Sequence, residues 1–397
     1  ASVIEGTVLI CTAKAANNCK LGSWTGSFKS TKTSVKVAAN KNMKIKRDKR
    51  VELLAPAGSF QSVVAAVNAG TDAVYMGGRR FGARAYADSA QAEGEDMVME
   101  AIRYCHLFSV KLYMTVNILF KDDELKELFS YIKPYYEAGV DGLIMQDLGA
   151  VRRIRAMFPD LEVHASTQQT ITSVAGARMA QRFGMTRAVV SRELSLQEIR
   201  KIHDESGMAL EDFCHGAMCY SYSGACFMSS LLGGRSGNRG RCAGTCRLCY
   251  ETAGQKGYYL SMKDMQTIEL LPELIEAGAY SFKIEGRMKT ALYVATVART
   301  YRKAIDDYLE DPKKYEANMP WYKDQISNCT YRQFTTGFYF GKPSEESQIY
   351  DSNTYIREYT YLGIIGEIKD GLYRIEQRNK FSVGEVIEIM KPDGQNV

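Results

Sequence analysis

Cysteines are crowded into one stretch of this 397-residue chain. Six of its ten cysteines lie between Cys214 and Cys249, in a segment that is also rich in glycine. Four of them are separated by six, fifteen and three residues in turn, namely Cys219, Cys226, Cys242 and Cys246. Thiolates this close together in a loop free to wrap suit a soft metal centre, either tetrahedral zinc or an iron–sulfur cluster. Zinc sites favour Cys-x2-Cys pairs, of which only Cys246 to Cys249 is an example, so we favour a cluster.

Arginines and tyrosines alternate with these cysteines. The arginines are Arg235, Arg239, Arg241 and Arg247, and the tyrosines are Tyr220, Tyr222 and Tyr250. Guanidinium groups bind phosphates and aromatic faces stack on unpaired bases, which is how single-stranded RNA is usually held. The alternative is that the arginines only balance the negative charge of metal-bound thiolates.

Polar side chains also follow the ends of several short apolar runs. They are Asn117, Asp147, His164 to Gln168, Arg192 with Glu193, His215, and Glu285 to Arg287. If the runs are parallel strands of one barrel, these side chains meet at its carboxyl-terminal mouth, where such barrels carry their chemistry. For any single residue the alternative is a salt bridge at the rim or a helix cap.

The elements that must position these residues alternate regularly. The apolar runs that we predict as strands are 51–54, 73–77, 111–116, 142–146, 161–164, 187–191, 210–214 and 280–284, and amphipathic segments such as 59–69, 123–138 and 264–277 lie between them as predicted helices. Eight strands alternating with helices predict an α/β fold, a TIM-like (βα)8 barrel, with the cysteine-rich segment inserted between strands 7 and 8. An open doubly wound sheet is the alternative.

The regions outside the barrel differ in composition. Residues 1–50 carry eleven Lys and Arg against two acidic residues, and we interpret 1–42 as a solvated basic extension rather than a nucleic-acid-binding arm. The barrel is predicted over 43–310 and a linker over 311–329. Residues 330–397, with period-2 alternation, predict a small all-β domain. We expect this domain to be truncated, because the turn signal Pro392–Gly394 is followed by only three residues.

Composition excludes several classes of protein. With 45% hydrophobic and 24% charged residues the chain is typical of a globular protein, and no apolar run approaches the roughly 18 residues of a membrane span. Ten cysteines in a chain large enough to form a core favour a reducing compartment over a disulfide framework. We therefore expect a cytoplasmic protein that does not engage a membrane.

Several motifs together resemble one known family. They are Glu52–Gly58, Asp72–Tyr75 with Gly77–Gly78, Ser166–Gln168, His215–Cys219, Tyr222–Gly224 before Cys226, Asn238–Gly240 before Cys242, Cys246–Arg247, and Lys283–Lys289. Over about residues 50–310 the chain is similar to the collagenase-like peptidase family U32, which is also a family of oxygen-independent hydroxylation proteins. The Lys283–Lys289 motif and the β domain make it similar to the RNA-modifying members rather than to those acting on quinone precursors.

The resemblance implies a 4Fe-4S cluster on Cys219, Cys226, Cys242 and Cys246. It also implies hydroxylation of RNA, either a tRNA wobble uridine with prephenate as the oxygen donor or an rRNA cytidine. We then expect Glu285 or Glu193 as the base that removes the ring proton, with His164 as a further catalytic candidate. Binding of RNA phosphate or of the donor's carboxylates would fall to Gln168, Arg235, Arg239, Arg241, Arg247, Lys283 and Arg287. Glu285 could instead pair structurally with Arg287 or Lys283.

Two other functions remain in play. A peptidase, as the family name records, is disfavoured because the sequence has no His-Glu-x-x-His helix, nucleophile elbow or Asp dyad motif, and holds only four histidines. A binding protein with a purely structural cluster is the third possibility. The sequence leaves open whether the chain associates with a second copy of itself or with a paralogue.

Overall fold

The computed structural model describes residues 9–14, 51–82, 96–369, 372–391 and 396–397. Its main body is a closed barrel of eight parallel strands, as predicted. The strands are β2 (Glu52–Pro56), β3 (Ala73–Gly77), β4 (Lys111–Val116), β5 (Gly142–Met145), β6 (Glu162–Ala165), β7 (Arg187–Val189), β8 (Ala209–Ala217) and β12 (Ala279–Ile284). Strand β12 closes the barrel because it pairs in parallel with both β8 and β2.

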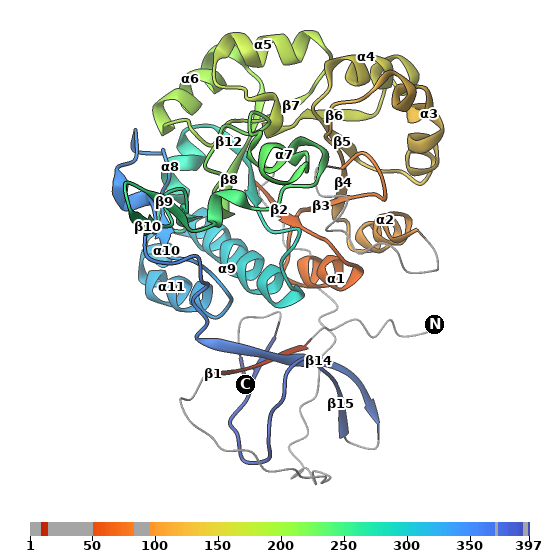
Figure 1. Cartoon of the computed structure of the whole chain (residues 1–397). Coiled ribbons are helices and arrows are strands. Elements are labelled where there is room, and N and C mark those ends of the chain that lie inside the picture. Colours follow the sequence, from red (N-terminus) through yellow and green to blue (C-terminus); the bar gives the residue numbers. More distant parts are fainter. Residues whose placement is uncertain (1–8, 15–50, 83–95, 370–371, 392–395) are drawn as a thin grey trace.

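Helices surround the strands (Figure 1). They are α1 (Phe60–Asn68), α2 (Met97–Leu107), α3 (Asp122–Glu137), α4 (Leu148–Met157), α5 (Val174–Arg182), α6 (Leu196–Ser206), α8 (Leu271–Glu276) and α9 (Ala291–Glu310). Side-chain caps fix where several begin: Ser59 accepts from the backbone of Ser62, and Ser195 and Glu198 form a capping box at α6. Most of the buried apolar residues lie in one large cluster to which both the strands and these helices contribute.

One predicted helix is wrong at its start. Residues 264–277 were expected to be helical throughout, but Asp264–Gln266 form strand β11 and the helix begins only at Leu271. Strand β8 runs on to Ala217, and β11 pairs antiparallel with that end while β13 (Phe334–Thr335) pairs in parallel with β11. The backbone groups of β11 therefore form hydrogen bonds with the extended end of β8. This tertiary pairing outweighs the local helical pattern of the segment.

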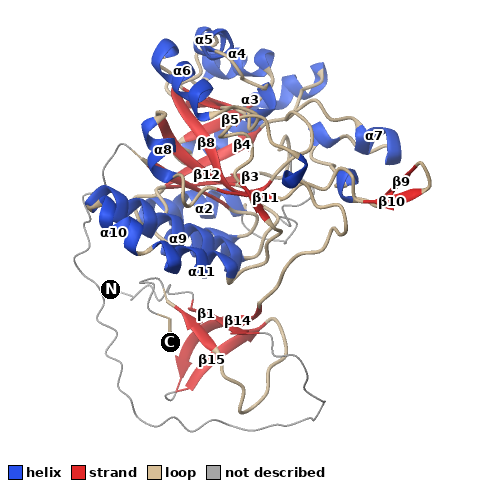
Figure 2. Ribbon diagram, turned by 90° about the vertical axis from the view of Figure 1, so that its left-hand side faces the viewer, coloured by secondary structure: helices blue, strands red, loops and turns tan. Residues whose placement is uncertain are grey.

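The cysteine-rich insertion leaves the barrel after β8, as predicted. It contains the short helix α7 (Met228–Gly233), the 3₁₀ turns η2 (Gly237–Arg239) and η3 (Thr245–Arg247), and the hairpin of β9 (Tyr250–Thr252) and β10 (Gln255–Gly257). In Figure 2, α7 and the hairpin stand beside the end of the barrel. The insertion is therefore placed against the mouth.

The segment predicted as a linker is helical instead. Residues 311–329 hold α10 (Pro312–Ala317) and α11 (Met319–Ser327), each with Pro in its first turn, where a missing N–H costs nothing. The hydroxyl of Tyr322 donates to the carboxylate of Asp307 on α9 at 2.6 Å. This contact fastens α11 to the barrel's last helix.

A small antiparallel sheet lies apart from the barrel mouth (Figure 2). Its strand order is β15 (Leu372–Gln377), β14 (Tyr359–Lys369), β1 (Leu9–Lys14) and β16 (Glu388–Met390). Its C-terminal strands begin at Tyr359 rather than near residue 330. The sheet packs on α9 through the contact of Met390 with Leu292. The all-β character of the C-terminal region is thus confirmed.

The central position of β1 was not expected. Of residues 1–42, which we interpreted as a solvated extension, the structure describes 9–14, and these pair with β14 on one side and β16 on the other. The remainder of the extension and the predicted turn at 392–394 lie outside the described residues. In the described part of the chain, no helix is long and apolar enough to cross a membrane.

Candidate functional site

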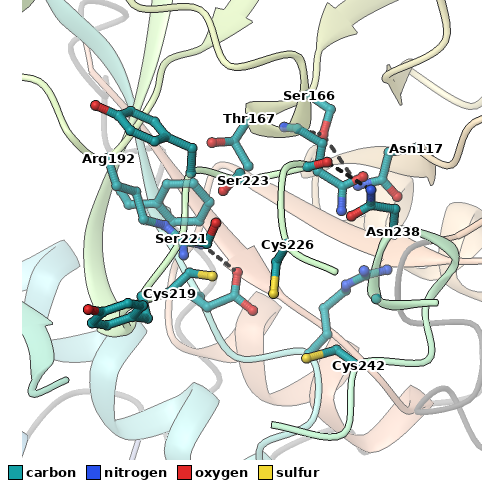
Figure 3. A pocket seen from close by; sticks show the side chains of 18 of the residues that line it. Asn117, Ser166, Thr167, Arg192, Cys219, Ser221, Ser223, Cys226, Asn238 and Cys242 are labelled. Atoms are coloured by element: carbon teal, nitrogen blue, oxygen red, sulfur yellow. Dashed lines mark hydrogen bonds and ion pairs between the residues drawn. The ribbon is translucent and has the colours of Figure 1, made fainter. Parts of the chain in front are cut away.

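A cavity lies between the carboxyl-terminal mouth of the barrel and the cysteine-rich insertion (Figure 3). We call it the main cavity. Its floor is formed by residues at the strand ends, which include Thr115, Gln168, Arg192, Lys283, Glu285 and Arg287. Its roof is formed by the insertion, including Cys219, Cys226, Cys242 and Cys246. Polar groups from distant parts of the chain therefore meet at the mouth, as the spacing of the strand ends predicted.

The floor is mainly cationic. Lys283 and Arg287 are only 5% and 6% exposed, and Arg192 lies beside them. Arg287 donates to the hydroxyl of Thr115 at 2.7 Å, and Arg192 contacts the carboxylate of Glu285 at 3.3 Å while its guanidinium lies over the ring of Phe213. Glu285 is the one carboxylate among the described residues that line this cavity, so the floor suits an anionic ligand held next to one potential base.

A buried ionic network supports the floor from inside the barrel. Arg187 contacts Glu52 at 2.6 Å and Glu211 at 3.2 Å, and Lys283 contacts Glu211 at 2.7 Å. Burial alone would raise the pKa of Glu211, but Lys283 and Arg187 outweigh it and hold that pKa below its ordinary value. The two basic and two acidic side chains are matched in number, so each buried charge has a partner of opposite sign. Lys283 belongs to both the network and the cavity.

The four predicted metal ligands line the same cavity. Figure 3 shows the sulfur atoms of Cys219, Cys226 and Cys242 turned toward one space. Cys242 Sγ accepts from the backbone N–H of Gly244 at 3.4 Å. Burial raises the pKa of Cys246, Arg247 opposes this, and the other three thiols add to it. Among the described residues no three His, Cys, Asp or Glu side chains are gathered as ligands of a single ion.

Two arginines of the insertion hold it in place. Arg247 donates to the carbonyl of Met218 at 2.9 Å and also to the carbonyl of Met262. Arg239 donates to the carbonyl of Leu119 at 2.6 Å and forms an ion pair with Glu124 at the start of α3. Both guanidinium groups thus bind protein. Arg235 and Arg241 are exposed at the surface of the roof, where Arg235 Nε donates to the carbonyl of Arg241 at 3.1 Å.

Two glycines permit close approaches of the backbone near the cavity, Gly216 between the ends of β8 and β12 and Gly224 between the roof and the floor. Gly216 has φ of +110°, and a Cβ there would lie 2.4 Å from the carbonyl oxygen of Glu285. Gly224 has φ of +86°, and its Cβ would lie 2.5 Å from the carbonyl oxygen of Gln168. A side chain at either position would strain the backbone, and at Gly224 it would also push the roof away from the floor.

The remaining predicted residues do not all reach this cavity. His164 is fully buried inside the barrel, where its Nε2 lies 3.2 Å from Glu162 and burial lowers its pKa. His215 is buried among aromatic rings, and burial lowers its pKa to about 3. Asp147 caps α4, because its carboxylate accepts from the backbone N–H of Ala150 at 2.9 Å. It therefore has the helix-cap role considered as the alternative for a residue at the mouth. Glu193 lines a second cavity instead.

Several residues of the interior and the roof have a role that the sequence alone did not assign to them. Glu52, Arg187 and Glu211 lie within or at the start of predicted strands, and a charged residue in an otherwise apolar strand is the signal that could have indicated an internal network. Asn238, on the roof, donates to the carbonyl of Gly224 at 2.7 Å. That contact joins residues fourteen apart inside a loop, and no periodic pattern indicates it.

Comparison with known proteins decides the family. Residues 58–349 match the model of peptidase family U32, and residues 357–397 match the U32 C-terminal domain. The chain belongs to peptidase family U32. The resemblance noted in the motifs is thereby confirmed, and the family match extends past the barrel to the end of the chain.

Named relatives in the U32 family differ in their described activities. The chain is 34% identical to "tRNA hydroxylation protein P1" of Bacillus subtilis over 88% of this chain and 85% of that protein. It is 39% identical to "23S rRNA 5-hydroxycytidine C2501 synthase" of Escherichia coli over 66% of this chain and 40% of that protein. It is 32% identical to "Collagenase" of Porphyromonas gingivalis over 73% of this chain and 74% of that protein.

Proposed function

We propose that this protein is an enzyme that hydroxylates RNA without molecular oxygen, with the tRNA wobble uridine as substrate and 5-hydroxyuridine as product. Its similarity to a protein named for tRNA hydroxylation, over most of both chains, supports this assignment. The observation that carries the proposal is one cavity with four thiols in its roof and a cationic, carboxylate-bearing floor.

The thiols fit a 4Fe-4S cluster. Four cysteines line one cavity and influence one another electrostatically, and each iron of such a cluster takes one thiolate, so the ligands surround the cluster rather than converge on one ion. When bound, the cluster would supply one-electron redox chemistry at the roof. Cys242 already accepts hydrogen bonds from the backbone of Gly244 and from Ser229, the kind of contact that tunes such centres.

The floor then positions the small reactant and removes a proton. Hydroxylation replaces a ring C–H by C–OH, which oxidises the ring carbon by two electrons. The donor's C–O bond must break as the new one forms, the donor takes up the two electrons, and a proton leaves the ring carbon. Glu285, oriented by Arg192, is the carboxylate placed to accept it. Lys283 and Arg287 would hold the carboxylates of the oxygen donor, for which we propose prephenate, because buried cations bind carboxylates strongly when water is excluded.

RNA would approach across the exposed part of the roof. Arg235 and Arg241 are exposed there, and the rings of Tyr220 and Tyr222 are 46% and 51% exposed. Cations for phosphates beside aromatic faces for bases are the usual means of holding a single strand. Arg239 and Arg247, whose guanidinium groups bind the protein itself, would support this surface rather than contact RNA.

Nucleoside mass spectrometry tests the proposal. This chain would be expressed in Bacillus subtilis lacking its tRNA hydroxylation protein P1, and total tRNA and rRNA would be digested and analysed. We expect a hydroxylated pyrimidine nucleoside that is absent from the vector control and from a strain expressing Glu285→Gln. If Glu285→Gln folds, keeps its iron and supports full hydroxylation, Glu285 is not the base.

The peptidase alternative makes a different prediction. All four histidines of the chain are described, and none lines the main cavity, which leaves zinc-dependent and histidine-activated peptidase chemistry without its usual residue there. If the metal-replete protein cleaves denatured collagen, loses that cleavage on Glu285→Gln, and produces no modified nucleoside, the peptidase assignment replaces the hydroxylase.

A further inference from the structure

A second cavity shares a wall with the main one. We call it the side cavity. Cys219, Tyr220 and Tyr222 line both cavities, and the opposite side of the side cavity is formed by Glu193 after β7 and by residues such as Phe338 and Gln348 from the C-terminal part of the chain. A molecule that fills the main cavity and continues past this wall would therefore place its next group in the side cavity.

The side cavity differs from the main cavity in charge. Glu193 is the one residue with a formal charge at neutral pH among its described lining residues, whereas the main cavity's floor holds three cations. A phosphate or carboxylate would be repelled by Glu193 and would find no cation to compensate it. The side cavity therefore suits a neutral or donor-rich group rather than a second anion.

Two of its residues, Glu193 and Gln348, offer acceptor oxygens that can take a further hydrogen bond. The Glu193 carboxylate accepts from the hydroxyl of Ser191, and further lone pairs remain on its two oxygens. Gln348 Oε1 is buried and receives no hydrogen bond within the described structure. Because a buried acceptor without a partner costs free energy, a ligand that donates to it would be favoured.

The shape of the lining adds a preference for flat rings. Tyr220 and Tyr222 are half exposed, and Phe338 stands on the other side. Aromatic faces together with hydrogen-bonding groups are how proteins hold a splayed-out nucleobase. Guanine has two adjacent donors, N1–H and the N2 amino group, on its Watson–Crick edge, and these match the two oxygens of a carboxylate. Uracil would turn a carbonyl toward one of them.

We propose that the side cavity is a base-recognition site that takes a guanine flanking the target nucleotide, with Glu193 and Gln348 accepting from its donors. This inference rests on the proposed action on RNA, and it gives Glu193 a role in recognition rather than in proton removal. The enzyme would then select its substrate by sequence as well as by the base it modifies.

Binding of short RNAs tests the site. The probes are fluorescein-labelled single-stranded heptamers with a central uridine and a poly-uridine background, in which each flanking position in turn carries G, A, C or U. Affinities would be measured by fluorescence anisotropy with the full chain purified without oxygen. At one flanking position, we expect G to bind about 5- to 150-fold more tightly than U, the range of a good bidentate base contact.

Three variants assign the preference to its residues. Glu193→Gln removes the charge and turns one acceptor into a donor, so it should abolish most of the preference for G. Gln348→Met removes an acceptor that has no partner in the free protein and should reduce the preference without harming the fold. Glu346 is exposed in the 3₁₀ turn Glu345–Ser347 just before Gln348 and lines neither cavity. Glu346→Gln removes an equal charge and should leave the preference unchanged.

The outcomes separate this inference from the proposed function. Binding that is equal for all four bases at every position, or a preference that Glu193→Gln retains, overturns the base-recognition site and leaves RNA hydroxylation standing. Failure of the wild-type protein to bind any heptamer overturns both. If the heptamers show no base preference while a labelled Gly-Gly-Arg-Gly-Gly peptide binds and Glu193→Gln abolishes that binding, the site takes a basic protein side chain and the guanine proposal fails.

Discussion

Replacement of Lys283 by Met should destabilise the barrel by leaving Glu211 short of a partner. The ammonium lies 2.7 Å from the carboxylate, and the two side chains are 6% and 0% exposed, so water cannot replace the lost contact. Removing one partner of a buried pair typically costs about 3–5 kcal/mol. Arg187 remains 3.2 Å from Glu211, which places the expected cost near the lower end, about 3 kcal/mol.

Thermal unfolding followed by circular dichroism measures this cost. For a domain of the barrel's size about 3 kcal/mol corresponds to a fall in Tm of roughly 6–12 °C. The pKa of Glu211 is held below its ordinary value, so its ionised form contributes stability at neutral pH, and that contribution is lost as the pH falls below about 4. The effect of Lys283→Met should therefore be complete at pH 7 and shrink as the pH falls below about 4.

The double variant Glu211→Gln/Lys283→Met provides the control. It leaves no unpaired charge on either residue, so it should recover more than half of the lost Tm even though it carries a second substitution. A decrease in Tm of less than about 2 °C in Lys283→Met would refute the idea that Lys283 and Glu211 depend on each other. A double variant whose decrease in Tm equals the sum of the decreases in the two single variants would refute it as well.

Three further predictions concern the metal, RNA and pH. The proposed iron ligands are Cys219, Cys226, Cys242 and Cys246. Ser substitution at any of them should abolish iron binding in anaerobic preparations, measured by iron analysis and absorbance, while Cys249→Ser and Cys105→Ser should keep it. Stoichiometric zinc without iron would contradict the cluster. Arg235→Gln should lower the slope of log affinity for tRNA against log salt by about one, whereas Arg239→Gln, which removes a guanidinium already paired with Glu124, should not. Burial, with a smaller contribution from Glu211, raises the pKa of Asp212 to about 7, so the stability of the wild-type protein should fall as the pH rises from about 4 to 7. Asp212→Asn should remove that fall and raise the free energy of unfolding by up to about 4 kcal/mol at pH 8. Parallel pH profiles of Tm for the two proteins would contradict this.

The barrel could be predicted because its signals are local. Each of the eight apolar runs is long enough to show a strand, and the number eight with intervening helices indicates closure without knowledge of any contact. The cysteine spacing likewise pointed to one loop, and the structure places the four thiols around one cavity. Both predictions rest on patterns within a few tens of residues.

What could not be predicted depends on contacts between distant residues. Glu52 and Arg187 are 135 positions apart, so their pairing inside the barrel leaves no trace in either local sequence. His164 was expected at the mouth, but the strand continues to Ala165 and the histidine faces the interior. Residues 264–266 became a strand because the extended end of β8 needs backbone partners. The pairing of β1 with β14 and β16 joins the two ends of the chain, which no local pattern could show.

The division of the main cavity into a barrel floor and an inserted roof bears on how its specificity could be re-engineered. The floor residue Lys283 is also part of the buried ionic network, so altering it risks the folding of the whole barrel. The roof is one continuous insertion, anchored by Arg239 at one point and by Arg247 at another. Exchange of residues 220–238 between family members, with Cys226 and both anchors kept, would therefore change the roof over an unchanged floor, and substrate choice could be varied without altering the buried ionic network.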